Sequence, residues 1–341
     1  MIKEVLYAFH TDSAQIENHR FRSWEHCITF FRNNKNQLQN ATVADHACLH
    51  LAFYLASWGM LRNSFLLQRD YKVHQKFLQD VVVKPEYTDL LAGRVLLPTN
   101  VNDMELLESL IEDTCTVYLP ILREVNRNDQ LQVSDTLISK ILLGVFGVVP
   151  AYDRFFKEAA GFHGINKQFN ITSFKQLHLF YNRFSEEFNS FIEETAKDSI
   201  RYTPMKVLDM YFWKIGDIFS NGKDVEQKER LVAFISHVKE KPMQTPADSY
   251  LKTGNRTEDI RRHIAMILQS EKTLGQNSAI ICARDIHNDL NLSHSYPSVC
   301  NAMGSVPGYK EYDIVYAPPS GKSSTVTYRY KFEGENDDAD A

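Results

Sequence analysis

The chain of 341 residues lacks any apolar run of the roughly 18 residues that a membrane-spanning helix requires. We also expect no leader peptide, because the first residues, Met-Ile-Lys-Glu, already carry charge. Its five cysteines include no Cys-x-x-Cys pair and are odd in number, so we expect reduced and mostly buried thiols. These absences predict a cytoplasmic protein without a membrane partner.

The sequence also lacks the patterns that mark common cofactor and metal sites. It contains no G-x-x-x-x-G-K-[ST] loop, no G-x-G-x-x-G loop, no H-E-x-x-H helix and no G-x-S-x-G turn. His46 and His50 are four residues apart and could share a metal ion, but no cysteine or carboxylate clearly completes the set. We therefore predict neither a cofactor nor a metal.

The charge balance gives no global signal for nucleic acid. The chain has 38 Lys and Arg against 43 Asp and Glu, a formal net charge of −5. The last nine residues hold five of these acidic residues and no basic one, so this total is compatible with a local basic face elsewhere. The ordinary apolar content of 43% and the length predict a globular protein of two or three domains.

Helical periodicity dominates the first 245 residues, and no stretch there alternates as a strand would. We predict an all-helical domain at 1–245, a linker at 246–256, a small α+β domain at 257–332 and an acidic tail at 333–341. The predicted fold class is mainly α, with a multi-helix N-terminal domain and a small C-terminal domain that contains strands.

The least polar stretch of the chain is 136–156. We predict a buried helix over 131–146 that is capped by Ser134, is stopped by Gly147 and delivers one carboxylate, Asp153, beyond its end. The helices before this stretch are expected to pack around it.

Trp58 and Arg62 lie in the apolar run 43–69, which predicts one long central helix or two close ones. Trp58 could be a core residue beside a Gly59 that allows close helix contact, or Trp58 and Arg62 could line a cleft. Because an arginine is costly to bury without a partner, we expect Arg62 to face a carboxylate or an anionic ligand.

The pattern changes after residue 256. Amphipathic helices are predicted over 258–270, 279–290 and 297–303, and the segments 313–316 and 325–332 alternate like the strands of a hairpin. This order is that of a winged helix, in which the third helix is short enough to enter a major groove and the hairpin reaches the flanking backbone. We therefore predict that the C-terminal domain is a winged helix and that its partner is double-stranded DNA.

The predicted DNA contacts lie in the second and third of these helices and in the turn of the hairpin, which offers hydroxyls and a cation to phosphates. Residues 256–332 hold nine Lys and Arg and seven Asp and Glu, a mild net charge of +2, so contact with another protein is the alternative. The predicted contact residues are Arg284, His287, Tyr296, Ser298, Asn301, Lys322, Ser323 and Ser324, with Ser320 beside them.

The run ARDIHNDLNLSHSYPSVCNAM, followed by APPSGKSSTVTYRYKF, resembles a winged-helix module of bacterial restriction and phage-defence proteins. The shared features are RDIH at 284–287, YPSVCNAM at 296–303 and the turn PPSGKSS, within about a quarter of the chain. The resemblance implies DNA binding in a defence setting and implies no reaction.

An apolar helix, a turn with a proline and then Asp153 resemble, over about 30 residues, the segment that carries the catalytic aspartate in helix-hairpin-helix DNA glycosylases. The resemblance implies that Asp153 stabilises positive charge on the sugar as the base leaves, while Trp58, Tyr152 and Trp213 receive the flipped base. The sequence departs from that family, because QLQVSDTLIS lacks its glycine-rich hairpin. Lys140 also lies closer to the aspartate than that family's reactive lysine.

Three functions are compatible with these observations. The first is a DNA-directed protein of defence or repair, a hydrolase whose helical domain excises a nucleobase with Asp153 as the catalytic carboxylate. The second is a non-enzymatic DNA-binding regulator or sensor whose helical domain binds a ligand or dimerises. The third is an adaptor whose winged helix contacts protein. The alternative role for Asp153 itself is structural, as a helix cap or as a partner of Arg154 or Arg62.

Overall fold

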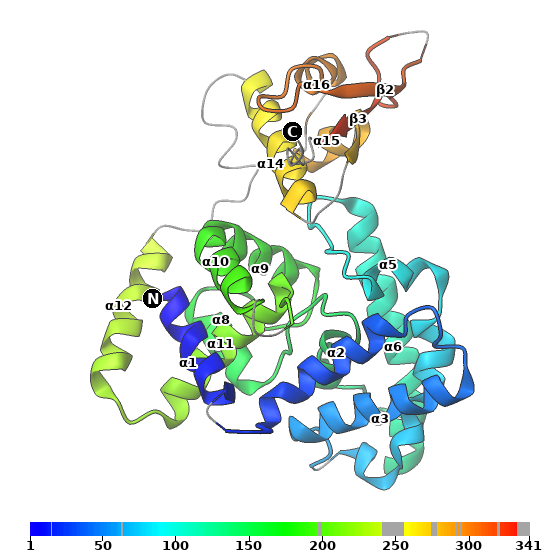
Figure 1. Ribbon diagram of the computed structural model, residues 1–341, viewed down its shortest axis with the longest axis vertical. Coiled ribbons are helices and arrows are strands. Elements are labelled where there is room, and N and C mark those ends of the chain that lie inside the picture. Colours follow the sequence, from blue (N-terminus) through cyan, green and yellow to red (C-terminus); the bar gives the residue numbers. More distant parts are fainter. Residues whose placement is uncertain are drawn as a thin grey trace, which may run out of the picture. The chain divides into compact units, whose positions relative to one another are not determined.

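The chain forms two compact units, residues 1–98 with 102–243 and residues 99–101 with 244–341. It is mainly helical, as predicted, and its strands form one small antiparallel sheet near the C-terminus (Figure 1). The computed structural model describes residues 1–14, 16–62, 64–196, 200–240, 256–273, 278–290, 292, 295–318 and 321–332.

The described part of the first unit contains helices and turns and no strand. Its helices pack around a single apolar core to which almost all of them contribute. The α-helices are α1 (Ile2–Ala14), α2 (Ser23–Asn33), α3 (Ala41–Ser57), α4 (Gln75–Phe77), α5 (Thr88–Leu91), α6 (Val101–Asn126), α7 (Asp135–Val145), α8 (Arg154–Phe162), α9 (Ile171–Arg183), α10 (Ser185–Thr195), α11 (Pro204–Asn221) and α12 (Val225–Glu240).

Helix α7 is the central helix of this unit, and its last nine residues are all buried. The Ser134 hydroxyl accepts a hydrogen bond from Leu137 N at 3.3 Å, and the helix ends before Gly147, whose φ of +69° suits glycine. Trp24 Nε1 of α2 donates to Leu143 O at 2.8 Å, and α3 packs beside it. The predicted cap and stop are confirmed, but the helix begins at Asp135, four residues after its predicted start at 131.

The prediction for the run 43–69 is wrong in its extent. Helix α3 ends at Ser57, Trp58 caps it, and Gly59 turns the chain with a φ of +74°. A side-chain carbon at Gly59 would meet nothing within 4 Å, so this glycine does not serve helix contact. That role belongs to Gly144 of α7, where such a carbon would lie 2.5 Å from the Tyr54 ring of α3.

Helices α8 and α11 approach so closely that only glycine fits between them. A side-chain carbon at Gly216 of α11 would lie 2.3 Å from the Phe155 carbonyl oxygen of α8. This contact fixes α11 beside the segment that joins α7 to α8. Several polar side chains of α11 are thereby held near Asp153.

The second unit is built in the order helix, strand, helix, helix, strand, strand. The two C-terminal strands and the short helix that precedes them confirm the predictions for those segments. The β1 and β2 strands both pair antiparallel with β3, so the sheet order is β1-β3-β2. The elements are α14 (Arg256–Thr273), β1 (Ser278–Cys282), α15 (Ala283–Asp289), α16 (Tyr296–Met303), β2 (Tyr312–Tyr316) and β3 (Thr327–Lys331).

The predicted helix over 279–290 is wrong in its first part, which is strand β1. Ala279 and Ile281 of β1 are buried, whereas Ser278 and Ile280 are exposed, and this alternation is that of a strand with one covered face. The strand forms because it pairs with β3, a partner almost fifty residues away along the chain. Only the remainder of the predicted helix forms α15.

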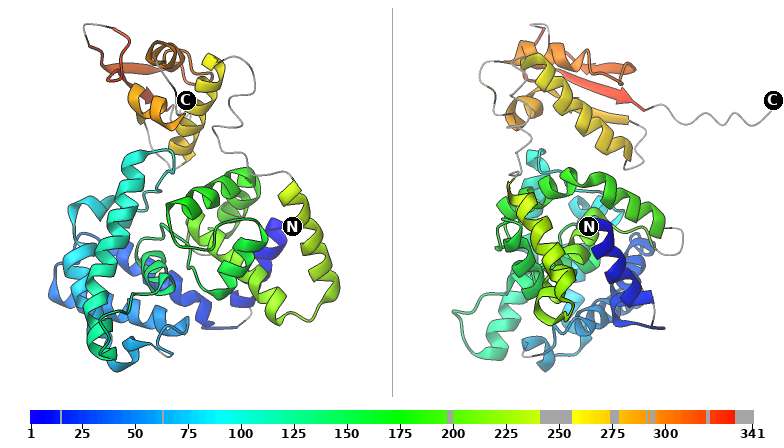
Figure 2. Two further views of the ribbon diagram at one scale, coloured as in Figure 1. Left: turned by 180° about the vertical axis from the view of Figure 1, so that it is seen from behind. Right: turned by 90° about the vertical axis from the view of Figure 1, so that its left-hand side faces the viewer.

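This unit has an apolar core of its own. Helix α14 packs on α16 and β1 through Ile260, Ile264 and Leu268, which recur every four residues (Figure 2). The Tyr330 hydroxyl of β3 donates to Met303 O of α16 at 2.6 Å. The predicted linker, apart from Arg256, and the predicted acidic tail lie outside the described residues.

No helix among the described residues is long and apolar enough to cross a bilayer.

Candidate functional site

Asp153 lies between α7 and α8 with both carboxylate oxygens engaged. Oδ1 accepts from Phe156 N at 3.1 Å and so caps α8, and Oδ2 lies 3.1 Å from Lys140 Nζ of α7. The Lys140 side chain is only 3% exposed and that of Asp153 is 17% exposed. The partner of Asp153 is therefore Lys140 rather than Arg154, which faces Glu158 at 3.8 Å, or Arg62.

A second buried ion pair lies close to the first. Lys206 Nζ and Asp209 Oδ2 of α11 are 2.8 Å apart, and Asp209 Oδ1 accepts from Ala151 N at 3.0 Å. Asp209 thus holds the backbone of the segment that leads to Asp153. Our sequence analysis missed this pair, although a lysine and an aspartate three residues apart in an apolar helix were the available signal.

The Trp58 ring joins the two ion pairs. Lys140 Nζ lies 5.0 Å and Lys206 Nζ 5.4 Å from its centroid, and Arg20 Cζ lies 5.5 Å from it. Cations at such distances are attracted to the face of an indole ring. The Trp213 ring approaches edge-on at 5.7 Å. We call Trp58, Lys140, Asp153, Lys206 and Asp209 the Trp58 site.

The indole Nε1 of Trp58 is buried and has no hydrogen-bond partner among the described residues. A buried donor without a partner costs free energy, so an acceptor that reached this N–H would stabilise the protein. The two lysines and two aspartates of the Trp58 site balance each other in charge. Chemically, the site offers a carboxylate, an amine and a free indole N–H in a poorly hydrated place.

Arg62 and Tyr152 do not join the Trp58 site. Arg62 lies exposed in the turn after α3, and it forms no ion pair within the described part of the chain, in contrast to our expectation. Tyr152 is 1% exposed, its ring lies against Phe156 and Phe169, and its hydroxyl is hydrogen-bonded to Ser173 at 2.6 Å. A flipped base could not reach Tyr152 without opening the core.

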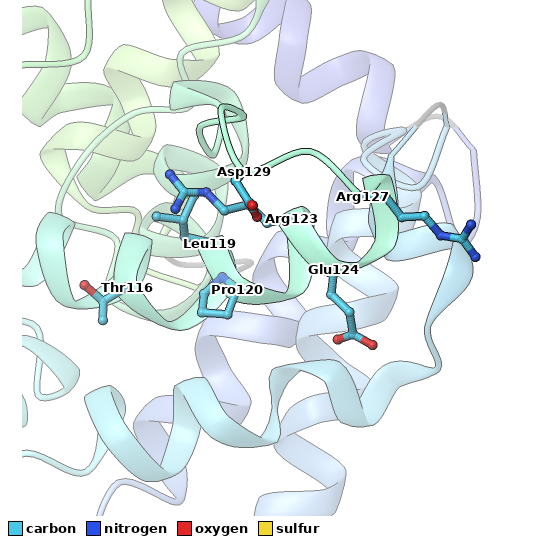
Figure 3. A pocket seen from close by; sticks show the side chains of 7 residues that line it. All are labelled: Thr116, Leu119, Pro120, Arg123, Glu124, Arg127 and Asp129. Carbon is cyan, nitrogen blue, oxygen red and sulfur yellow. The ribbon is translucent and has the colours of Figure 1, made fainter.

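Two pockets of the first unit lie elsewhere. One, of about 730 Å³, lies along the C-terminal half of α6, where Arg123 and Arg127 extend in opposite directions (Figure 3). Glu124 forms an ion pair with Arg69 at 2.8 Å. Since the two arginines also diverge, the charged groups of this pocket do not converge on one point. The second, of about 400 Å³, lies on α2.

Three histidines, His26, His46 and His50, are near neighbours. Burial lowers the pKa of His50, and the nearby His26 and His46 lower it further. Within the described ranges, however, no group of three or more His, Cys, Asp or Glu could hold a metal ion.

The residues predicted to contact DNA lie in α15, in α16 and in the loop between β2 and β3. Lys322 Nζ of the loop donates to Asn301 Oδ1 of α16, and Arg284 N at the start of α15 donates to Ser324 O at 2.9 Å. His287 of α15 stacks on Tyr296 of α16, with the ring centroids 4.1 Å apart. The structure therefore brings these residues together as neighbouring pairs.

The second half of this loop is packed against α16 and the end of β1. The Cys300 and Cys282 thiols approach Ser323 O and Ser324 O at 3.6 and 3.4 Å, and the Ser323 hydroxyl lies 3.1 Å from that of Thr325. The expected contact at Ser320 lies outside the described residues.

Three of the predicted contact residues are exposed: Arg284, Asn301 and Lys322. Ser298, in the first turn of α16, is half-buried. We call these four residues the α16 surface.

Comparisons of the chain with protein-family models, with curated proteins and with solved structures found no match.

Proposed function

We propose that the protein is a DNA-directed regulator or sensor, in a bacterial defence or repair setting, whose C-terminal unit is a winged helix that contacts double-stranded DNA. The observation that carries the proposal is the topology of this unit. The order is helix, strand, helix, helix and hairpin, with β1 beside β3. One side of α16, with Pro297 and Asn301, is exposed, and the β2–β3 loop lies next to it through the Lys322–Asn301 hydrogen bond. Helix α16 has eight residues and is therefore about 12 Å long, which suits the major groove.

The chemistry of the α16 surface supports two kinds of DNA contact. Lys322 and Arg284 are exposed cations that can neutralise backbone phosphates. Asn301 and Ser298 carry a carboxamide and a hydroxyl, which can exchange hydrogen bonds with base edges. The Lys322–Asn301 hydrogen bond couples the phosphate-binding group to the base-reading group.

Selection of bound sequences from a random duplex library tests this proposal. The wild-type protein should enrich a short motif, and Asn301→Ala should relax the preference at about one base position, at a cost of about 1–3 kcal/mol. Lys175→Gln, an exposed lysine of α9, is the control and should leave the enriched motif unchanged. Absence of any enriched motif would argue against base reading by α16.

A second candidate function is excision of a nucleobase at the Trp58 site. The observation that favours it is a carboxylate and an amine, Asp153 and Lys140, 3.1 Å apart in a poorly hydrated place beside Trp58. The carboxylate could stabilise positive charge on a sugar as the base leaves. Because Asp153 also caps α8, the reaction would require Lys140 to move away from it.

Alkali treatment of DNA tests this candidate. The purified protein is incubated with duplexes that carry normal or modified bases, which are then heated in alkali to break the strand at abasic sites. Strand breaks that disappear in a folded Asp153→Asn variant would establish base excision. Intact strands, together with DNA binding, would leave the non-enzymatic regulator.

A further inference from the structure

The pocket of about 400 Å³ on the first unit is separate from both candidate sites. One face of α2 forms most of its wall, because Arg22, which caps α2, is followed by His26 and Asn33 at spacings of four and seven residues. His50 of α3 closes the pocket from another side. Its volume lies within the range of small-molecule sites, about 300–1,000 Å³.

The acidic group of this pocket is already satisfied within the protein. Glu25 Oε1 accepts from the Tyr202 hydroxyl at 2.6 Å, and its Oε2 lies 3.5 Å from Arg22 Nε. A guanidinium has five N–H donors, so most of those of Arg22 are left for a ligand. The pocket therefore offers more hydrogen-bond donors than acceptors.

Two imidazoles also line the pocket, and each can supply one N–H donor. Neither His26 nor His50 has a hydrogen-bond partner among the residues that the structure describes. The His50 ring is held by stacking on Phe30, with the centroids 4.2 Å apart. Burial, and after it His26 and His46, lowers the pKa of His50, and a bound anion would oppose this shift.

We propose that this pocket binds a small ligand through a phosphate group. Arg22 and His26 hold phosphate oxygens, Asn33 supplies a further N–H donor, and the stacked Phe30 and His50 rings pack against the remainder of the ligand. Guanidinium groups are especially suited to phosphate because two of their N–H groups can bind two of its oxygens. This site goes beyond the proposed DNA binding and does not depend on it, although in a sensor its ligand would be the signal.

Isothermal titration calorimetry of the full chain tests the site with inorganic phosphate, AMP and adenosine as probes. Inorganic phosphate and AMP should bind, and adenosine, which lacks the phosphate, should bind at least about tenfold more weakly than AMP. Arg22→Gln should weaken AMP binding by about tenfold to a hundredfold, because it removes charge-assisted hydrogen bonds. Arg127→Gln, in the pocket along α6, is the matched control and should leave the affinity unchanged.

Three outcomes would overturn the proposal: no heat with either phosphate or AMP at millimolar concentration, equal affinity for AMP and adenosine, or unchanged affinity in Arg22→Gln. Arg22 is exposed, so its variant should fold, and a thermal melt checks this. His26→Gln provides a second variant with the same expected direction. DNA binding, measured separately, distinguishes failure of this site from failure of the proposed function.

Discussion

At the scale of single residues, Asp153 performs two structural tasks at once. Its carboxylate accepts a hydrogen bond from the first turn of α8 and neutralises the buried ammonium of Lys140. A charge that is buried without a counter-charge is costly, so Lys140 depends on this carboxylate. The same arrangement holds the carboxylate still and away from bulk water, which is also what a catalytic aspartate requires.

Asp153→Asn should therefore lower the free energy of unfolding by about 2–4 kcal/mol, because asparagine can still cap α8 but leaves Lys140 without its counter-charge. Urea denaturation measures this change. The matched control is Arg154→Gln, whose side chain is 71% exposed and which should change stability by less than about 0.5 kcal/mol. Unchanged stability of Asp153→Asn would contradict the structural role and would strengthen the catalytic one.

The sequence predicted part of the Trp58 site and missed the rest for identifiable reasons. Asp153, Lys140, Trp58 and Trp213 were all candidates, and three of them belong to the site, with Trp213 packed against it. The Lys140–Asp153 pairing depends on how α7 and α8 meet, which periodicity does not reveal. Tyr152 was taken for a cleft residue because a sequence does not show which face of an aromatic ring the core covers.

At the scale of elements, the unit that carries Asp153 depends on the close contact of α8 and α11. Gly216 lets the two backbones meet, and α11 thereby supplies the Lys206–Asp209 pair to the Trp58 site.

Gly216→Ala should destabilise the protein by about 1–3 kcal/mol, because its added carbon would lie within 2.3 Å of the Phe155 carbonyl oxygen. This is the net change, because the cost of the clash should exceed the gain of about 1 kcal/mol in helix propensity that alanine brings over glycine. Gly161→Ala of α8 is the control, since there the added carbon meets only the flexible end of Lys167. Urea midpoints that are equal for the two variants would show that the α8–α11 contact is not tight.

Helices and strands were predictable from sequence where the local signals agreed. They were missed where pairing with a distant segment determined the secondary structure. For α7, the apolar run, the cap at Ser134 and the stop at Gly147 all indicated one helix. For β1, the residues Ala279–Cys282 are compatible with either a helix or a strand, and pairing with β3 decides between them. For α3, the apolar run continued beyond the point at which Gly59 turns the chain.

At the scale of the whole molecule, the two units have separate apolar cores, and that of the first encloses histidines that cannot easily be charged. Burial lowers the pKa of His74 to about 3, that of His163 to about 4 and that of His178 to about 3. In the unfolded chain such groups titrate near about 6.5.

The first unit should therefore lose stability as the pH falls below about 6.5, because these histidines then bind protons in the unfolded chain but stay neutral in the folded chain. Above that pH these histidines are neutral in both the folded and the unfolded chain, so they cause no loss of stability there. Towards pH 5, each should approach a slope of about 1.4 kcal/mol per pH unit. Urea denaturation at pH 7.5 and pH 5 measures the change.

His178→Leu removes one of the three groups and should make this pH dependence shallower. The His178 Nε2 atom is buried without a hydrogen-bond partner among the described residues, so leucine should also fit the surroundings. Stability that is equal at the two pH values, or a slope that His178→Leu does not change, would contradict the account.

The central claim is that the α16 surface contacts duplex DNA, and fluorescence anisotropy of a labelled duplex over a range of salt concentrations tests it most directly. Log affinity should fall linearly with log salt concentration, and Lys322→Gln and Arg284→Gln should each reduce the slope by about one, because each removes one phosphate contact. Lys175→Gln should leave the slope unchanged. Binding that does not depend on salt, or a slope that neither variant changes, would contradict the claim.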